Sequence, residues 1–190
     1  MRAIADKAGK NNARAGRGGF TLIELLVVMF ILAILVAIVV SVSSYVTKSA
    51  NEKETRGTQA LVMEAIQSWH DADPNPTTKS YPPDEYVSGT YVPEDSPQIL
   101  VNQLTGVSST APVLGAPDAA GPQVKAAKDI LLKLPRQAWA GLASDLIKDA
   151  WGVPMRYEQA GGLGGRPVLI SAGADKVFGS DDDIRSDEKQ

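Results

Sequence analysis

One carboxylate in this chain lies where a charge is costly. Glu24 is inside an apolar run that extends from Phe20 to Val40, in which Thr21 is the only other polar residue. An aspartate at the centre of a membrane helix costs about 2.5–3.5 kcal/mol on the insertion scale. A glutamate in this position therefore predicts a function, and the positive group with which it pairs has to be identified.

A second set of carboxylates lies near the C-terminus, in "ISAGADKVFGSDDDI". Asp175 is separated by five residues from the run 181–183, which is far enough for a loop to close on one ion. Calcium takes six to eight oxygen ligands from carboxylates and carbonyls, so this loop could bind it. The spacing does not fit an EF-hand. The alternative interpretation is that "SDDDIRSDEKQ" is only a solvated acidic tail.

Other kinds of chemistry have little support in the sequence. The chain has no cysteine, which excludes disulfides and thiolate metal sites, and its single histidine, His70, has no catalytic signature around it. We expect His70 to be exposed at the end of a helix. The glycine-rich stretch "AGGLGG" is not followed by a Lys-Ser/Thr pair or by a helix, which argues against a phosphate-binding loop.

Charge is distributed unevenly along the chain. Of the total of −3, residues 1–19 contribute +4, so the remaining residues carry −7. A basic N-terminus before an apolar run is typical of a membrane-inserted chain whose N-terminus stays in the cytoplasm. The acidic body argues against nucleic acid as a partner.

The apolar run is long enough to cross a bilayer, because 21 helical residues span roughly 31 Å. A secretory signal peptide has a shorter apolar core of about 7–15 residues and a cleavage site after it. Here the small residues Gly18 and Gly19 lie before the run. A plain membrane anchor would explain the length and the flanking charge, but neither Glu24 nor the glycines.

The stretch "GFTLIELLVVMFILAILVAIVV" resembles the N-terminal signature of type IV pilins and of the pseudopilins of type II secretion. The resemblance implies cleavage after Gly19 by a prepilin peptidase and N-methylation of Phe20. It also implies that Glu24, four residues past the new amine, meets the amine of a neighbouring subunit in a filament. The alternative is that Glu24 merely snorkels to the membrane interface. Many members have a proline after the apolar run, whereas this chain has "VVSVSSYV", so strong loosening of the helix there is not expected.

The helix is predicted to continue to about Trp69. In "TQALVMEAIQSWHDADPNP", Leu61, Ala65 and Trp69 are four residues apart, as are Val62 and Ile66. This is one apolar stripe at helical spacing, and we expect it to pack on a sheet. The acidic residues and prolines that follow end the helix.

Residues 71–148 are predicted to form an irregular connector with short helices. One helix is expected in "SPQILVNQLTG", with Ser96 as its cap and Ile99, Leu100 and Leu104 facing inward. Further helices are expected in "KAAKDILLKLP" and "AGLASDLIKD". The stretches "VPMRYEQ" and "RPVLISA" predict two strands of a hairpin joined by "AGGLGG".

Two C-terminal stretches resemble the G-type major pseudopilins of type II secretion. "DAWGVPMRY" is similar to their Asp-Pro-Trp-Gly segment, with Ala150 in place of the proline, and "ISAGADKVFGSDDDI" is similar to their calcium loop. The resemblance implies Asp175, Asp182 and Asp183 as side-chain calcium ligands, with the carbonyl of Ala172 as a further candidate.

The resemblance implies an α+β fold of the pilin lollipop kind, with a long N-terminal helix, its first half transmembrane, packed on a small C-terminal antiparallel sheet. The expected segments are a cleaved leader (1–19), a transmembrane helix (20–41), its amphipathic continuation (42–70), the connector (71–148) and a hairpin with the acidic loop (149–190).

The function implied by the resemblance is structural, not enzymatic. The chain would be a subunit of a type II secretion pseudopilus, anchored in the bacterial inner membrane with its C-terminal domain in the periplasm, that polymerises to drive protein export across the outer membrane. The implied partners are further copies of itself, the prepilin peptidase, an inner-membrane assembly platform with its ATPase, and minor pseudopilins. The alternatives are a surface type IV pilin for adhesion, motility or DNA uptake, and an anchored binding domain that does not polymerise.

Overall fold

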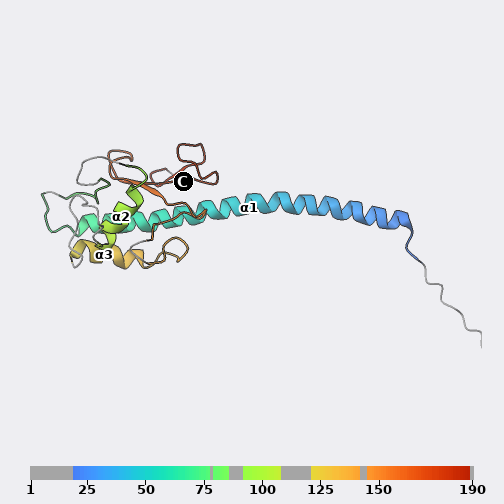
Figure 1. Cartoon of the computed structure of the whole chain (residues 1–190), viewed down its shortest axis with the longest axis horizontal. Helices are drawn as coiled ribbons and strands as arrows, with labels where there is room; N and C mark the ends of the chain where they lie inside the picture. Colours follow the sequence, from blue (N-terminus) through green and yellow to red (C-terminus); the bar gives the residue numbers. More distant parts are fainter. Residues whose placement is uncertain (1–18, 78, 86–91, 108–120, 142–144, 189–190) are drawn as a thin grey trace, which may run out of the picture. The chain divides into compact units, whose positions relative to one another are not determined.

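The structure is a computed structural model that describes residues 19–77, 79–85, 92–107, 121–141 and 145–188 (Figure 1). Apart from Gly19, the predicted leader lies outside the described residues, as do parts of the predicted connector. The chain divides into two compact units, residues 1–44 and 45–190. Helix α1, Leu22–Asp71, is a single element of 50 residues that contributes to both units.

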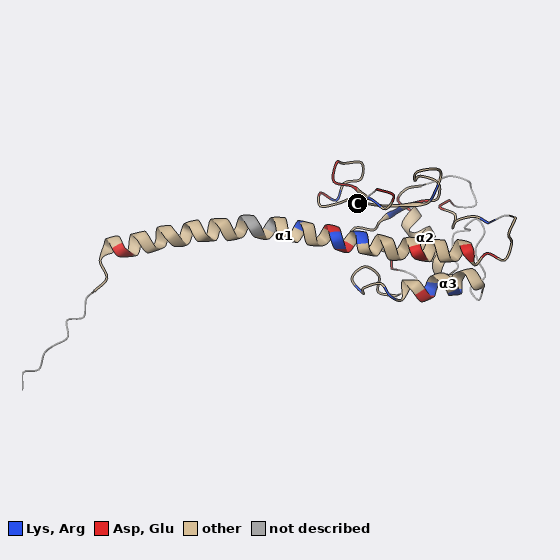
Figure 2. Ribbon diagram, turned by 180° about the vertical axis from the view of Figure 1, so that it is seen from behind, with Lys and Arg blue, Asp and Glu red and all other residues tan. Residues whose placement is uncertain are grey.

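The described part of the first unit consists of Gly19–Thr21 and the first half of α1. Its large apolar side chains are between 46 % and 84 % exposed, so no described residue covers them. Glu24 is the acidic residue in the first turn of α1, where the ribbon of Figure 2 is red. No further charge follows before Lys48. By length and composition this part of α1 could cross a membrane, as predicted. Such a surface is stable in a bilayer or against other apolar helices, because exposure of this much apolar area to water is unfavourable.

The second unit is built on the second half of α1. A three-stranded antiparallel sheet has the order β1-β2-β3, with β1 at Arg156–Glu158, β2 at Val168–Ser171 and β3 at Ile184–Arg185. Tyr157 of β1 pairs with Leu169 of β2, and Ser171 pairs with Ile184 of β3. Two further helices, α2 (Ser96–Thr105) and α3 (Pro122–Leu131), complete the unit.

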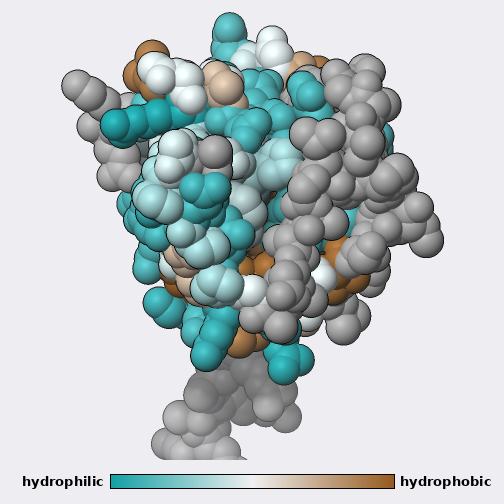
Figure 3. All heavy atoms as spheres, turned by 90° about the vertical axis from the view of Figure 1, so that its left-hand side faces the viewer, coloured by the Kyte–Doolittle hydropathy of each residue, from teal (hydrophilic) through white to brown (hydrophobic). Residues whose placement is uncertain are grey.

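One hydrophobic core joins these elements. The apolar stripe of α1 is buried as predicted through Val62, Ala65, Ile66 and Trp69, whereas Leu61 is only partly buried. The core includes residues of α2, α3, β1 and β2 as well, namely Leu100, Leu104, Ala127, Leu131, Tyr157 and Leu169. The α+β fold with a long N-terminal helix packed on a small antiparallel sheet is therefore confirmed. On the face of the second unit seen in Figure 3 the described residues are mainly hydrophilic, with smaller hydrophobic areas between them.

Several local predictions need correction. Ser96 is the first residue of α2 and not its cap; Asp95 precedes the helix without a capping side-chain bond. The Ser96 hydroxyl instead donates to the carbonyl of Pro93 and accepts from the Tyr157 amide at 3.1 Å, so it ties α2 to β1. The predicted inward positions Ile99, Leu100 and Leu104 are buried.

The stretch 140–149 is not helical in its described part, because residues 145–149 have no regular secondary structure except an isolated β-bridge of Lys148 with Pro154. His70 is not fully exposed: its ring stacks on Tyr81, with 4.5 Å between the centroids, and its side chain is 22 % exposed. The strand β3 was not predicted.

Candidate functional site

Glu24 is held at the start of α1 by a reciprocal capping box with Thr21. The Glu24 Oε2 atom accepts from the Thr21 backbone N–H at 2.8 Å and from its hydroxyl at 2.9 Å. The Thr21 hydroxyl oxygen in turn accepts from the Glu24 N–H at 3.3 Å. This arrangement satisfies donors that a helix leaves unpaired at its N-terminus. The sequence signal was the Thr-x-x-Glu spacing before an apolar run, and it was missed.

The second carboxylate oxygen of Glu24, Oε1, accepts no hydrogen bond from the residues that the structure describes. Phe20, Ile23, Val27 and Val28 form a shallow apolar hollow around the carboxylate. One oxygen is thus used within the helix, and the other can accept from a positive group outside it. Gly19 and Phe20, the predicted cleavage and methylation positions, lie directly before the capping box, and Phe20 is 84 % exposed.

The acidic loop connects β2 to β3, and Asp182 organises it. Its Oδ2 atom accepts from the N–H groups of Ala174 and Asp175 at 2.8 and 3.0 Å, and its Oδ1 atom accepts from the Ser180 hydroxyl at 2.6 Å. The Ser180 hydroxyl and the Asp175 amide lower the pKa of Asp182 to about 2. Gly173, with φ +63°, lies so close to Asp182 that a Cβ atom would overlap its carbonyl oxygen. A side chain at position 173 would therefore push the loop open.

The other two predicted calcium ligands lie in the same loop. Asp175 Oδ1 accepts from the Val177 N–H at 2.8 Å, and Asp183 Oδ2 accepts from the Gly179 N–H at 2.7 Å. Asp183 Oδ1 is buried and has no hydrogen-bond partner. A buried carboxylate oxygen without a donor is unfavourable, so this atom is the feature of the loop that a cation would satisfy.

The described residues nevertheless contain no group of three or more His, Asp or Glu side chains that is arranged to hold a metal ion. Asp182 uses both of its oxygens to close the loop, which leaves Asp175 and Asp183 as the freer carboxylates. The structure brings the predicted ligands into one loop without forming a complete ligand set, and calcium binding stays a prediction.

The turn before β1 is fixed by a buried carboxylate. Asp149 is 4 % exposed; its Oδ1 atom accepts from the N–H groups of Trp151 and Val153 at 3.0 and 2.8 Å. Its Oδ2 atom accepts from the Ser171 hydroxyl at 2.7 Å, and the Ser171 oxygen accepts from the Gly173 N–H at 3.2 Å. The "DAWG" segment was selected from its resemblance alone, and the structure gives it a physical role: it connects this turn to β2 and to the base of the acidic loop.

Two polar residues of α1 hold the same region and were missed by the sequence analysis. Buried Gln59 donates through Nε2 to the carbonyl of Ile184 at 2.7 Å and to that of Leu169 at 3.3 Å, so it bridges β3 and β2. The Thr55 hydroxyl accepts from the Ala150 N–H at 3.1 Å. Both side chains lie on the buried face of the helix, where the search for an apolar stripe gave no signal.

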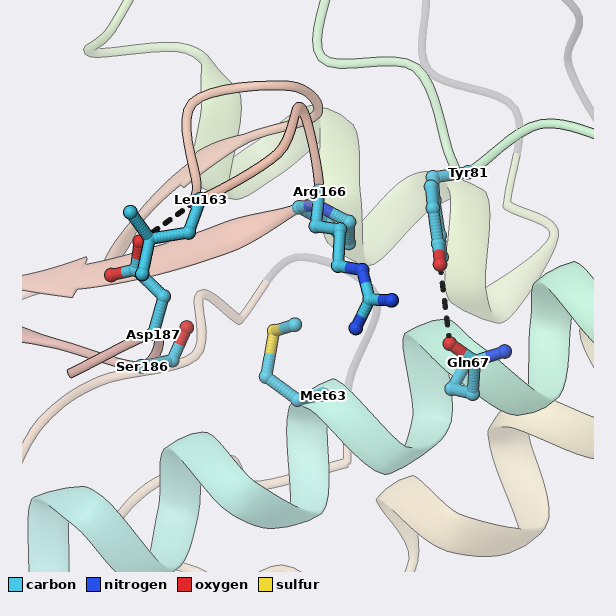
Figure 4. Close-up of a pocket in the computed structure, with 8 residues that line it drawn as sticks. Met63, Gln67, Tyr81, Leu163, Arg166, Ser186 and Asp187 are labelled. Carbon is cyan, nitrogen blue, oxygen red and sulfur yellow. Dashed lines mark hydrogen bonds between the residues drawn. The ribbon is translucent and has the colours of Figure 1, made fainter. Parts of the chain in front are cut away.

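A cavity of about 370 Å³ opens between α1, the β1–β2 loop and the segment after β3 (Figure 4). The Arg166 side chain points into it without a hydrogen-bond or ion-pair partner among the described residues. Tyr81 donates to Gln67 Oε1 at 3.3 Å on one wall, and Asp187 accepts from the Leu163 N–H at 3.1 Å on the other. The lining residues include no imidazole and no nucleophile paired with a base, so this cavity does not have the arrangement of a hydrolytic active site.

Comparison with known proteins gives one match. Residues 14–40 match the family described as the prokaryotic N-terminal methylation motif. No curated protein and no solved structure matches the chain. The matched stretch contains Gly19, Phe20 and Glu24 and covers the N-terminal part of α1. It supports a place among the type IV pilin-like proteins, which implies processing by a prepilin peptidase and assembly into a filament.

Proposed function

We propose that this chain is a subunit of the pseudopilus of a type II secretion system, which polymerises through its N-terminal helix to drive protein export across the outer membrane. The observation that carries the proposal is the methylation motif at residues 14–40, which includes the start of an apolar helix with a single carboxylate, Glu24. Its role is structural: the helix is anchored in the inner membrane, leaves it during assembly and packs against the helices of neighbouring copies.

The exposed first half of α1 supports assembly. In a filament its apolar side chains exchange lipid for the helices of other copies. The carboxylate of Glu24 meets the N-terminal amine of a neighbour, which offsets the desolvation of both charges and fixes their register. The capping box leaves Oε1 of Glu24 available for this contact.

A surface type IV pilin is the second candidate, since the methylation motif is common to both kinds of filament. The "DAWG" turn and the acidic loop favour the secretion pseudopilus, because they resemble those of G-type major pseudopilins. A strain that lacks this chain distinguishes the two. Exported proteins that accumulate in the periplasm support the pseudopilus, whereas loss of surface filaments with normal export supports the surface pilin.

We expect processing to remove residues 1–19 and to methylate the new N-terminus. Intact-mass measurement on the membrane form should give a chain that begins at N-methylated Phe20. Gly19→Leu should block cleavage, because a small residue before the scissile bond is part of the motif, and the full-length mass should then remain. A wild-type chain that keeps Met1 in a host with an active prepilin peptidase would contradict the pilin-like assignment.

Calcium is the proposed ligand of the acidic loop, with Asp175 and Asp183 as principal ligands and Asp182 as the residue that shapes the site. A ligand at a hundred times its dissociation constant adds about 2.7 kcal/mol of stability to the folded state. Residues 49–190 contain the whole core of the second unit. This fragment should therefore melt several degrees higher in millimolar calcium than in chelator. Magnesium should substitute poorly, because it prefers smaller octahedral sites.

Substitutions can distinguish the loss of calcium binding from the loss of the loop's own stability. Asp183→Ala should abolish the calcium-dependent shift, since it removes the buried unpaired oxygen, and Asp175→Ala should reduce or abolish it. Asp182→Ala should lower the melting temperature even in chelator, because the amides of Ala174 and Asp175 lose their acceptor. The matched control Asp187→Asn should leave the calcium-dependent shift unchanged. Equal melting of the wild type in calcium and in chelator would show that the loop is a solvated acidic segment.

A further inference from the structure

The second unit carries a basic face although the body of the chain is acidic. Residues 122–148, which include α3, carry a net charge of +3. Five cations of this stretch are exposed, namely Lys125, Lys128, Lys133, Arg136 and Lys148; we call the first four the basic face. Among the described residues only Lys133 has an ion-pair partner, Glu64 at 3.9 Å. The other three cations of the basic face form no ion pair with a residue that the structure describes.

An apolar residue lies among these cations. Leu132 directly follows α3 and is 66 % exposed, which is unusual for the second unit, where most large apolar side chains are in the core. An exposed leucine flanked by charges can form the apolar centre of a contact whose rim is polar.

The acidic loop has the same composition with the opposite charge. Residues 175–188 carry a net charge of −4, even with Lys176 and Arg185 included. Val177 is 59 % exposed and follows Lys176, whose φ of +63° turns the chain at this point. Asp181, which is not among the proposed calcium ligands, has no partner within the described part of the chain. The loop thus presents an apolar residue beside unpaired negative charge.

These two surfaces cannot meet within one molecule. Figures 1 and 2 both place α3 on one side of α1 and the C-terminal segment on the other. Two complementary patches at different places on one surface produce a head-to-tail contact, which repeats from copy to copy and generates an open helical array when it does not close into a ring.

We propose that the basic face of one copy binds the acidic loop of a second copy, with Leu132 against Val177 and with Lys128 and Arg136 near Asp181. This inference rests on the proposed function, because it gives the filament a contact between its water-exposed units in addition to the packing of its helices. Such charge complementarity sets the register between copies and disfavours like-on-like approach.

Cross-linking tests the contact directly, because the chain has no cysteine of its own. The full-length double variant Leu132→Cys/Val177→Cys, expressed with the assembly machinery and treated with a short bismaleimide, should give a ladder of bands beyond the dimer. Each single variant can give a dimer at most. The matched control Leu163→Cys/Val177→Cys also has two cysteines at exposed apolar positions but leaves the basic face intact, and it should give no ladder.

Charge reversal provides the second measurement, on the cross-linking double variant. Lys128→Glu and Asp181→Lys should each weaken the ladder, and their combination should restore it. Wild-type filaments without a ladder from the Leu132/Val177 pair would overturn this inference and leave the proposed function in place. Absence of filaments from the wild type in a competent host would overturn both.

Discussion

Replacing Asp149 by alanine should destabilise the second unit more than any other single substitution of a polar residue discussed above. The change removes a buried acceptor and leaves the amides of Trp151 and Val153 and the hydroxyl of Ser171 without it. A buried donor that is left without its acceptor costs about 1–3 kcal/mol, and this substitution affects three donors at once. A domain is stable by only about 5–15 kcal/mol, so the melting temperature of the 49–190 fragment should fall by about 10 °C or more.

Two further variants test whether the loss of stability is due to the hydrogen bonds of Asp149. Asp149→Asn keeps one carbonyl oxygen of similar geometry, so its loss should be smaller than that of the alanine variant. Asp129→Ala removes an exposed carboxylate on α3 and should change stability by no more than about 0.5 kcal/mol. The measurement is thermal or urea unfolding followed by circular dichroism. If Asp149→Ala melts like Asp129→Ala, the turn does not hold the sheet in the way the hydrogen bonds indicate.

The elements that the sequence predicted well are those whose signal is local. The apolar stripe at helical spacing from Val62 to Trp69 predicted the buried face of α1. The glycine-rich stretch between two runs of strand-forming residues predicted the β1–β2 hairpin. In both cases the pattern repeats within a few residues, so the fold can be inferred without knowledge of distant partners. The apolar run that ends at Val40 is the clearest case, because its length and composition alone show that it could cross a membrane.

The failures are contacts between distant residues. Gln59 donates to a carbonyl that lies 125 residues further along the chain, and nothing in "TQALVMEAI" distinguishes it from an exposed glutamine. The strand β3 has only two residues and follows three aspartates, so its composition indicates a loop. Serine is a residue type typical of helix caps, but the Ser96 hydroxyl donates to the carbonyl of Pro93 and accepts from the Tyr157 amide. The contact with Tyr157 depends on tertiary packing.

The acidic loop shows the same limit of reasoning from local patterns. The resemblance to G-type pseudopilins implied Asp175, Asp182 and Asp183 as calcium ligands, and the structure places all three in one loop. Their different roles were not predictable, since they depend on which backbone amides the folded loop turns toward each carboxylate. Asp182 accepts from two of these amides, whereas Asp183 keeps a buried oxygen without a donor. At the other end of the chain, the capping box was readable from Thr21 and Glu24 but was overlooked, because the charge of Glu24 suggested a partner in another subunit.

Glu24→Leu should leave the chain cleaved and inserted but unable to join filaments. Insertion should be no worse, because the substitution removes a charge from the membrane segment. Assembly should fail, because the amine of the neighbouring subunit would enter the helix bundle without a counter-charge. The measurement is overexpression with the assembly machinery, followed by shearing of the cells and electron microscopy of the released filaments, with the cleaved mass as the check on processing.

The capping box offers a second explanation for the same loss, and two variants distinguish the explanations. Glu24→Gln keeps a side-chain oxygen that can accept from Thr21, as glutamine does in capping boxes, but it removes the charge. Thr21→Ala keeps the charge and breaks the box. If Glu24 acts as a counter-charge, Glu24→Gln should fail like Glu24→Leu, and Thr21→Ala should still form filaments. If Glu24→Gln assembles normally and Thr21→Ala does not, Glu24 acts by starting the helix. Normal filaments from Glu24→Leu would show that the carboxylate has no role in assembly at all.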